Sequence, residues 1–430
     1  MARTATKLAV SPLRRRVDPD RALVNVDSIV QVERPEEPVH CLRPMTIAAT
    51  AHLFTQAFPG DVLYAVKCNP EPRVLRAVWA GGVRHFDCAS AAEVALVRQM
   101  FAEAEIHFMH PVKSRAAIRE AFSRHGVRDF VIDSADELAK IIDETRVRRD
   151  KARLGLIVRL AVSGKGAAYD LSGKFGATAA EAVALLRAAR PWAKRLGLSF
   201  HVGSQCLSPA AYTEALALTG SVVAAAGEPV EIVDVGGGFP VSYANTVPTP
   251  LSDYFVAIER GLESAGLAGK VRLWAEPGRV LVAAGVSVLL QVQLRRGNDL
   301  YVNDGIYGSL SDAGVPGFQF PVRLVRVGGP LPSPQCQSYR FFGPTCDSAD
   351  RMDGPFELPV DVREGDWIEI GQLGAYGAAL RTAFNGFDRA RIVDVNDPPL
   401  IATPGHLPLH QPLNQSLATA RRSPRFRRSS

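Results

Sequence analysis

The chain has 430 residues, 47% of them hydrophobic and 22% charged, and a formal net charge of +6. This composition is typical of an ordinary globular protein, and the length suggests two domains. Arginines crowd the two ends, at residues 14–16 and 421–428, and leave the body of the chain close to neutral, so we expect no nucleic-acid site there. The sequence contains no apolar run of about 18 residues and no hydrophobic signal core. We therefore expect no membrane partner and a cytoplasmic location.

The six cysteines show no paired spacing of the Cys-x-x-Cys type. Neither a disulfide framework nor a zinc ribbon is indicated, so we expect no metal. This use of cysteine fits a reducing compartment.

The N-terminal part of the chain predicts four features in order. Residues 1–20 are expected to be a disordered arm. The apolar, β-branched residues 22–32 predict a strand, within an N-terminal segment 21–42 that joins the second domain rather than the first. Residues 46–58 predict a helix, and the apolar run 62–66 predicts a buried strand, which Asn69-Pro70 ends.

A lysine, Lys67, stands at the end of this last strand. Lysine is seldom fully buried without a partner. One interpretation is a strand-end lysine whose ammonium group reaches solvent. The other is a lysine held in a pocket with a lowered pKa, ready to form a Schiff base with an aldehyde.

From here the chain alternates short β-like runs with longer Ala-rich helical runs. About eight such units predict a (β/α)8 barrel over residues 43–280. An open doubly wound sheet is the alternative, but no Gly-x-Gly-x-x-Gly opens the first unit. The expected strands are 83–88, 105–109, 129–132, 154–161, 198–202, 231–235 and 271–275, and the expected helices include 91–101, 114–125, 134–145, 179–196 and 209–226.

After Arg279 the pattern changes to strands separated by Gly and Pro. Expected strands at 280–294, 300–302, 320–327 and 367–370 predict an all-β C-terminal domain over residues 281–400. Residues 404–430 are rich in Pro, Ser and Arg and are expected to be a disordered basic tail.

Polar residues gather where the barrel strands end, which is where barrel enzymes place their active sites. Consecutive glycines follow one strand at 236–238 and suit either a tight turn or a phosphate cradle. Glu276 and Arg279 end the next strand, as a salt bridge or as a carboxylate beside a phosphate-binding fork. With Lys67, they form the set that pyridoxal 5'-phosphate (PLP) needs: an imine-forming lysine, an acid for the ring nitrogen and a phosphate site.

Two further strand ends add polar groups. His201 and Ser204 supply an imidazole and a hydroxyl, and Asp87 supplies another acid. A lone histidine is more often structural, but His201 is also placed to stack on a cofactor ring.

Nine stretches, in order, carry a resemblance to a known family: YAVKCNP, FDCASAAEV, LSGKFGAT, HVGSQC, DVGGGFP, EPGR, YVNDGIYGS, GPTCDSAD and GAY…FNGF. Together they closely resemble the PLP-dependent group IV decarboxylases, which act on ornithine, lysine, arginine or diaminopimelate and have an alanine-racemase-like barrel. The resemblance covers about residues 40–390. It is closest to the ornithine-specific members, and the second-domain motifs look like the form found in alphaproteobacteria.

The resemblance implies a role for each residue of the barrel site. Lys67 is the Schiff-base lysine, His201 stacks on the ring and Glu276 pairs with the pyridine nitrogen, while Arg159 supports the site near the lysine. We also count Asp87, from its place at a strand end, among the cofactor-binding residues. The residues implied to hold the phosphate are Ser204, Gly236, Gly237, Gly238, Gly278, Arg279 and Tyr376.

The resemblance also implies a homodimer with shared active sites. Cys346 and Asp347 of the partner subunit reach into the barrel site, where Cys346 returns a proton to the substrate carbon and Asp347 binds the distal amine of the substrate. Animal-type enzymes carry a second acid for that amine in a Tyr-Asp pair. This chain has no such pair, and Asp312 is the nearest acid, so we count it as substrate-binding.

The expected function is therefore decarboxylation of L-ornithine to putrescine. The enzyme alternatives are a lysine/ornithine, lysine, arginine or diaminopimelate decarboxylase. Asp347 stands where diaminopimelate enzymes typically have Glu, and biosynthetic arginine enzymes are usually much longer chains. A non-catalytic homologue usually lacks PLP-binding residues that are present here, and an amino-acid racemase lacks the Gly-Pro-Thr-Cys-Asp segment.

Overall fold

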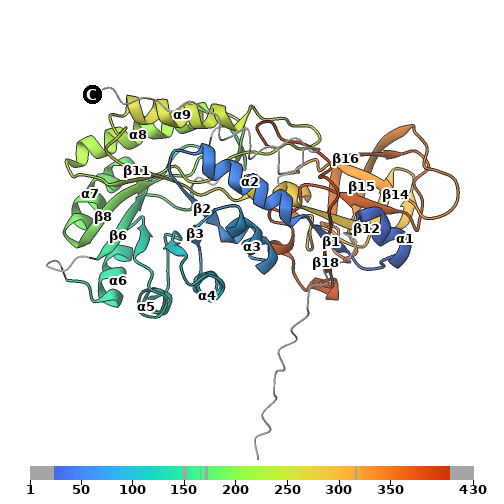
Figure 1. The fold of residues 1–430 in the computed structure, drawn as a ribbon, viewed down its shortest axis with the longest axis horizontal. Coiled ribbons are helices and arrows are strands. Elements are labelled where there is room, and N and C mark those ends of the chain that lie inside the picture. Colours follow the sequence, from blue (N-terminus) through green and yellow to red (C-terminus); the bar gives the residue numbers. More distant parts are fainter. Residues whose placement is uncertain (1–23, 149–152, 165, 170–172, 315–316, 407–430) are drawn as a thin grey trace, which may run out of the picture.

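The computed structural model describes residues 24–148, 153–164, 166–169, 173–314 and 317–406. Within these ranges a barrel of parallel strands with surrounding helices adjoins a mostly β region, as Figure 1 shows. This confirms the predicted (β/α)8 barrel followed by a β domain. No helix in the described part is long and apolar enough to cross a bilayer.

Eight strands close the barrel in the order β10-β11-β2-β3-β4-β5-β6-β8. They are β2 (Asp61–Ala65), β3 (His85–Cys88), β4 (Glu105–Phe108), β5 (Asp129–Ile132), β6 (Leu154–Arg159), β8 (Ala193–Ser199), β10 (Ile232–Asp234) and β11 (Arg272–Ala275). Every neighbouring pair is parallel, so all eight C-terminal ends open on one face.

The helices between the strands form the outer layer of the barrel (Figure 1). They are α2 (Pro44–Ala57), α3 (Pro72–Ala80), α4 (Ala91–Met100), α5 (Arg115–Ser123), α6 (Ala135–Thr145), α7 (Ala179–Ala189), α8 (Ala210–Ala226) and α9 (Leu251–Ser264). Several begin at a serine or threonine whose side chain accepts a backbone N–H, such as Ser90 for α4 and Thr178 for α7. Inside the barrel, a separate cluster that includes Leu63, Ile157 and Trp274 fills the floor below the open face.

The β domain is built on one sheet with the path β14-β17-β12-β13-β15-β16. Its strands are β12 (Val286–Arg296), β13 (Asp299–Val302), β14 (Val322–Val325), β15 (Cys336–Phe342), β16 (Arg351–Pro359) and β17 (Trp367–Ile370). The N-terminal strand β1 (Val39–Leu42) pairs with both β12 and β18 (Arg391–Asp394), so segments far apart in sequence complete this sheet.

The strand predicted at residues 22–32 is wrong where the structure describes it. Residues Val26–Glu33 form the helix α1, which packs its buried Val26, Ile29 and Val30 against the β domain. Asn25 caps the helix in a capping box with Ser28. The apolar spacing i, i+3, i+4 is helical, and β-branched composition concealed it.

Two other predicted boundaries are corrected. The strand expected at 280–294 begins with helical turns, α10 (Arg279–Val282) and a 3-10 turn at Ala283–Gly285, and only then becomes β12. The helix expected at 179–196 ends at Ala189, because Pro191 interrupts it and β8 starts at Ala193. Strands β15, β16 and β18 were not predicted, because their exposed polar residues dilute the apolar signal.

Candidate active site

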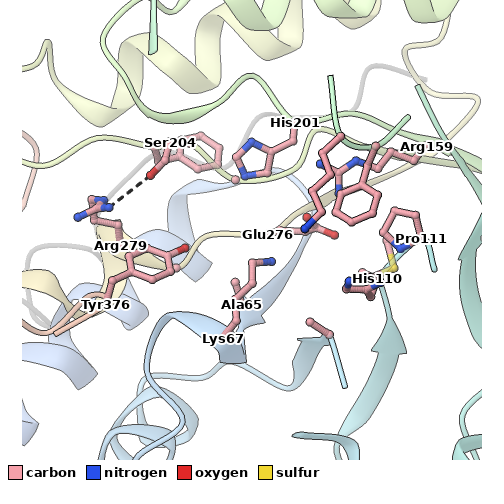
Figure 2. A pocket seen from close by; sticks show the side chains of 18 residues that line it. Ala65, Lys67, His110, Pro111, Arg159, His201, Ser204, Glu276, Arg279 and Tyr376 are labelled. Atoms are coloured by element: carbon pink, nitrogen blue, oxygen red, sulfur yellow. Dashed lines mark hydrogen bonds between the residues drawn. The ribbon is translucent and has the colours of Figure 1, made fainter. Parts of the chain in front are cut away.

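A cavity of about 460 Å³ opens at the C-terminal face of the barrel. Most of the expected barrel-site residues line it, because each follows a strand: Lys67 comes after β2, Arg159 ends β6, His201 follows β8 and Glu276 follows β11. Figure 2 shows Ser204, Arg279 and Tyr376 at one end, Lys67 and Glu276 in the middle, and Arg159 and His110 at the other end. The cavity is long enough to present different chemistry at its two ends.

Lys67 is held by an ion pair at the floor of the cavity. Its Nζ lies 2.8 Å from Oδ2 of Asp87, whose side chain is 1% exposed, whereas the lysine side chain keeps 43% exposure because it opens on the cavity. Burial lowers the pKa of Lys67, but the carboxylates of Asp87 and Glu276 outweigh burial and raise the pKa above its usual value. The interpretation that gave Lys67 a lowered pKa is therefore wrong, because Asp87 holds the amine as a paired ammonium group.

The carboxyl group of Glu276 is buried beside a second acid. Burial, then Asp234 and Asp87, raise the pKa of Glu276 well above its usual value. Burial also raises the pKa of Asp234, to about 6, although Oδ1 accepts the N–H of Gly236. Two buried acids that hydrogen-bond each other, as Asp234 and Glu276 do, favour sharing one proton, so Glu276 is able either to hold or to release it.

The salt bridge considered for Glu276 and Arg279 does not form. Arg279 instead pairs with Asp312, 2.8 Å from Nη2 to Oδ2, and donates to the hydroxyl of Tyr243 at 2.6 Å. It also donates to Ser204 Oγ at 3.4 Å (dashed in Figure 2). Asp312, expected to bind substrate, lies here against the cation of the phosphate end.

The glycines after β10 form a close-packed turn, of which Gly237 and Gly238 line the cavity. Gly236 and Gly238 have φ of +68° and +101°, which side chains rarely adopt. A Cβ on Gly237 would lie 2.6 Å from the carbonyl oxygen of Glu276, so that position must stay bare. Gly278 also lines the cavity, and Tyr376 does so from a left-handed backbone conformation with φ 59°.

His201 is a neutral imidazole in this structure. Burial, with Arg159 and Lys67, lowers the pKa of His201 to about 3. Its Nδ1 accepts the N–H of Gly203 at 3.1 Å, which leaves the ring proton on Nε2. A fixed, uncharged ring on the cavity wall is suited to stacking against a flat ligand.

Cys346 and Asp347 do not line this cavity. They lie in the β domain, in the loop that joins β15 to β16, and line a separate depression of about 500 Å³ whose wall also includes residues of β12 and β13. The hydroxyl of Tyr307 donates to Asp347 and lowers the pKa of that carboxyl group. Cys346 is exposed and contacts Asn385. A single chain therefore leaves the two expected substrate-facing residues apart from Lys67.

Sequence reasoning missed part of the cavity wall. Three residues line the end of the cavity opposite Arg279: His110, Lys174 and Phe175. The rings of His110 and Phe175 lie edge to face, with their centroids 5.1 Å apart. His110 follows β4, so the strand-end rule would have found it. Lys174 and Phe175 lie in a loop beyond β6, within the LSGKFGAT stretch of the resemblance, which gave neither residue a role.

The residues present fit PLP. One end offers a guanidinium whose Nε has no hydrogen-bond partner among the described residues, a hydroxyl and bare glycine backbone, all suited to a phosphate group. The middle offers a primary amine and a carboxyl group, the two groups that attach the aldehyde and pair with the ring nitrogen, beside a neutral imidazole (Figure 2). No group of three or more side chains suited to a metal ion occurs in the ranges described.

Comparison with known proteins agrees with this class of site. Residues 45–283 match the family described as pyridoxal-dependent decarboxylase, pyridoxal binding domain. An ornithine decarboxylase of Panagrellus redivivus is 31% identical over 417 residues, which cover 90% of this chain and 91% of that protein.

Solved structures align over similar lengths. The lysine/ornithine decarboxylase of Vibrio vulnificus, complexed with putrescine, aligns with a TM-score of 0.73 and 32% identity over 86% of this chain and 97% of that one. The arginine decarboxylase of Paramecium bursaria Chlorella virus gives 0.75 and 26%, over 86% and 99%. The chain belongs to the pyridoxal-dependent decarboxylase family. It is a PLP-dependent amino-acid decarboxylase.

Proposed function

We propose that this enzyme converts L-ornithine to putrescine, as a homodimer in which each barrel site is completed by the β domain of the partner subunit. The observation that carries the substrate choice is the adjacent pair of Cys346 and Asp347, a thiol and a short carboxylate on one exposed loop. A substrate with a cationic distal end needs such a carboxylate.

In this proposal the barrel residues bind and orient the cofactor. Arg279, Ser204 and the glycines after β10 hold its phosphate, while His201 stacks on the ring. Glu276 holds the proton of the ring nitrogen, and Lys67 is the point of covalent attachment. When bound, PLP supplies an electron sink for the negative charge that develops on the substrate Cα as CO2 departs.

The β domain of the partner subunit finishes the reaction. Cys346 of the partner subunit gives a proton to Cα, which a thiol can do as a general acid. Asp347 of the partner subunit binds the distal ammonium and sets the length of substrate that fits. We also propose that the enzyme works in a reducing compartment such as the cytoplasm, since all six cysteines are free.

The second candidate is a decarboxylase that uses lysine and ornithine alike. Two observations favour it: the aligned Vibrio vulnificus protein carries both substrates in its name, and the ion pair of Asp312 with Arg279 leaves Asp347 without a second acid at the distal amine. Diaminopimelate requires a cation for its second carboxylate, which Asp347 cannot supply.

One turnover assay separates these candidates. CO2 release from ornithine, lysine, arginine and diaminopimelate should give the highest kcat/KM for ornithine, a lower value for lysine and almost none for diaminopimelate. Asp347→Asn should raise KM for ornithine by about tenfold or more while leaving PLP affinity unchanged. Asp353→Asn, an exposed acid in the same domain, is the matched control and should change neither. A kcat/KM for lysine or diaminopimelate above that for ornithine refutes the substrate choice.

A further inference from the structure

The Cys346 loop contacts a residue that the proposed reaction does not yet use. Oδ1 of Asn385 accepts the backbone N–H of Cys346 at 3.1 Å and its thiol at 3.2 Å. The backbone N–H can only donate, so it fixes which end of the Asn385 amide faces the loop. One oxygen thus holds both the backbone and the sulfur of the same cysteine.

Asn385 occupies an unusual backbone position to make these contacts. It has φ 52° and ψ 11°, inside the 3-10 turn Phe384–Gly386. Left-handed backbone is uncommon away from glycine, and it persists where surrounding contacts determine it. Asparagine tolerates this conformation better than most residues and also brings a side-chain oxygen.

The turn is tied to the same loop that holds Asp347. The N–H of Thr382 donates to the carbonyl of Tyr307, and the rings of Tyr307 and Phe384 lie 4.9 Å apart. Tyr307 in turn donates its hydroxyl to Asp347. The turn therefore keeps the thiol and the carboxylate in one relative arrangement.

We propose that Asn385 is a positioning residue, which holds the Cys346 thiol protonated and aimed from a fixed loop until the substrate carbon needs its proton. This inference rests on the proposed role of Cys346. In the transfer the S–H bond breaks, a C–H bond forms from the electron pair on Cα, and the thiolate recovers a proton from water. Oδ1 receives the S–H before the transfer and disfavours a negative sulfur, because an oxygen acceptor repels a thiolate.

The test measures the thiol directly in the PLP-loaded enzyme without substrate. Iodoacetamide reacts with the thiolate, and mass spectrometry follows Cys346 and the exposed Cys336 as separate peptides of the same sample. Asn385→Gly removes the amide but keeps the left-handed backbone. Asn385→Asp keeps the shape and places a carboxylate against the sulfur.

The two variants should move alkylation in opposite directions. Asn385→Gly should speed alkylation of Cys346 by about two- to fivefold, the size of one weak hydrogen bond, and Asn385→Asp should slow it by a similar factor or more. Cys336 should react at the wild-type rate in both. A loosened loop would speed both variants, so equal or parallel changes at Cys346 overturn the inference.

A turnover assay separates this inference from the proposed function. Asn385→Gly should lower kcat for ornithine and leave KM nearly unchanged, because Asp347 and the barrel residues remain. If Cys346→Ala retains full kcat, the role proposed for Cys346 fails, whatever the alkylation results. If Cys346→Ala is inactive and alkylation does not respond to Asn385, only the positioning role fails.

Discussion

The ion pair of Lys67 with Asp87 determines how readily the lysine can attach the cofactor. Only a neutral amine carries the lone pair that attacks an aldehyde. In the cofactor-free protein Asp87 and Glu276 raise the pKa of Lys67, so the reactive form is a small fraction at neutral pH. Asp87→Asn removes the nearest negative charge and keeps the shape of the side chain.

The size of the effect follows from the 2.8 Å separation. Coulomb's law gives about 6 kcal/mol at an effective dielectric constant of 20 and about 1.5 kcal/mol in bulk water. Because the lysine side chain is 43% exposed, solvent screening favours the lower end. About 1.5–3 kcal/mol corresponds to a fall of roughly one to two units in the pKa of Lys67.

The assay is the initial rate of covalent attachment when PLP is mixed with cofactor-free enzyme at pH 8, followed by absorbance. Asp87→Asn should speed attachment by about tenfold or more, because the neutral fraction of Lys67 grows by that factor. The wild-type rate should rise with pH across pH 7–9, since the raised pKa keeps the ion pair intact until strongly alkaline pH. Asp353→Asn, which removes an exposed carboxylate of the β domain paired with Arg351, is the matched control. An Asp87→Asn rate equal to or below wild type refutes the reasoning.

Three further predictions follow from the same geometry. Borohydride reduction should leave PLP covalently bound to Lys67 in peptide mapping, and recovery on another lysine would contradict the assignment. Inactive Lys67→Ala and Cys346→Ala subunits, once mixed and exchanged, should regain about a quarter of wild-type activity, because half of the dimers have one intact shared site; no recovery despite proven exchange contradicts the shared site. Burial lowers the pKa of His40 to about 4 and that of His201 to about 3, so below about pH 6.5 the unfolded chain takes up protons that the folded chain does not. The unfolding free energy of the wild type, measured in urea relative to that of His40→Gln or His201→Gln, should therefore fall by about 2 kcal/mol between pH 7 and 5. This difference cancels the opposite contribution of Asp234 and Glu276, and a difference that does not change with pH would contradict the reasoning.

Much of the barrel and of its cavity could be predicted because one rule connects sequence to position. A buried parallel strand is an apolar run, and the residue that follows it faces the open end. Lys67, His201 and Glu276 obey that rule, and the structure brings all three to one cavity. Lys174 and Phe175 reach the same cavity from a loop, where no periodicity marks a residue as inward-facing.

The protonation state of Lys67 could not be predicted from the sequence in the same way. The pKa of Lys67 depends on two carboxylates that approach it from other strands, and the direction of its shift reverses the expectation from burial alone.

The helix α1 was mistaken for a strand because Val26, Ile29 and Val30 favour strands by composition, while their spacing and the Asn25 cap favour a helix. In this segment, packing of the apolar helix face against the β domain outweighs the preference of β-branched residues for strands.

The ion pair of Arg279 with Asp312 fixes the cation at the phosphate end of the cavity. A buried guanidinium without a counter-charge is strongly unfavourable, and the side chain of Arg279 is only 6% exposed. Asp312 supplies that counter-charge, just as Asp87 does for Lys67. The cations at the phosphate end and in the middle of the site are therefore both oriented by ion pairs, Arg279 by Asp312 and Lys67 by Asp87. The same pairing bears on the substrate-binding role predicted for Asp312, because its carboxylate lies 2.8 Å from Nη2 of Arg279 and would have to leave that cation to reach a distal amine.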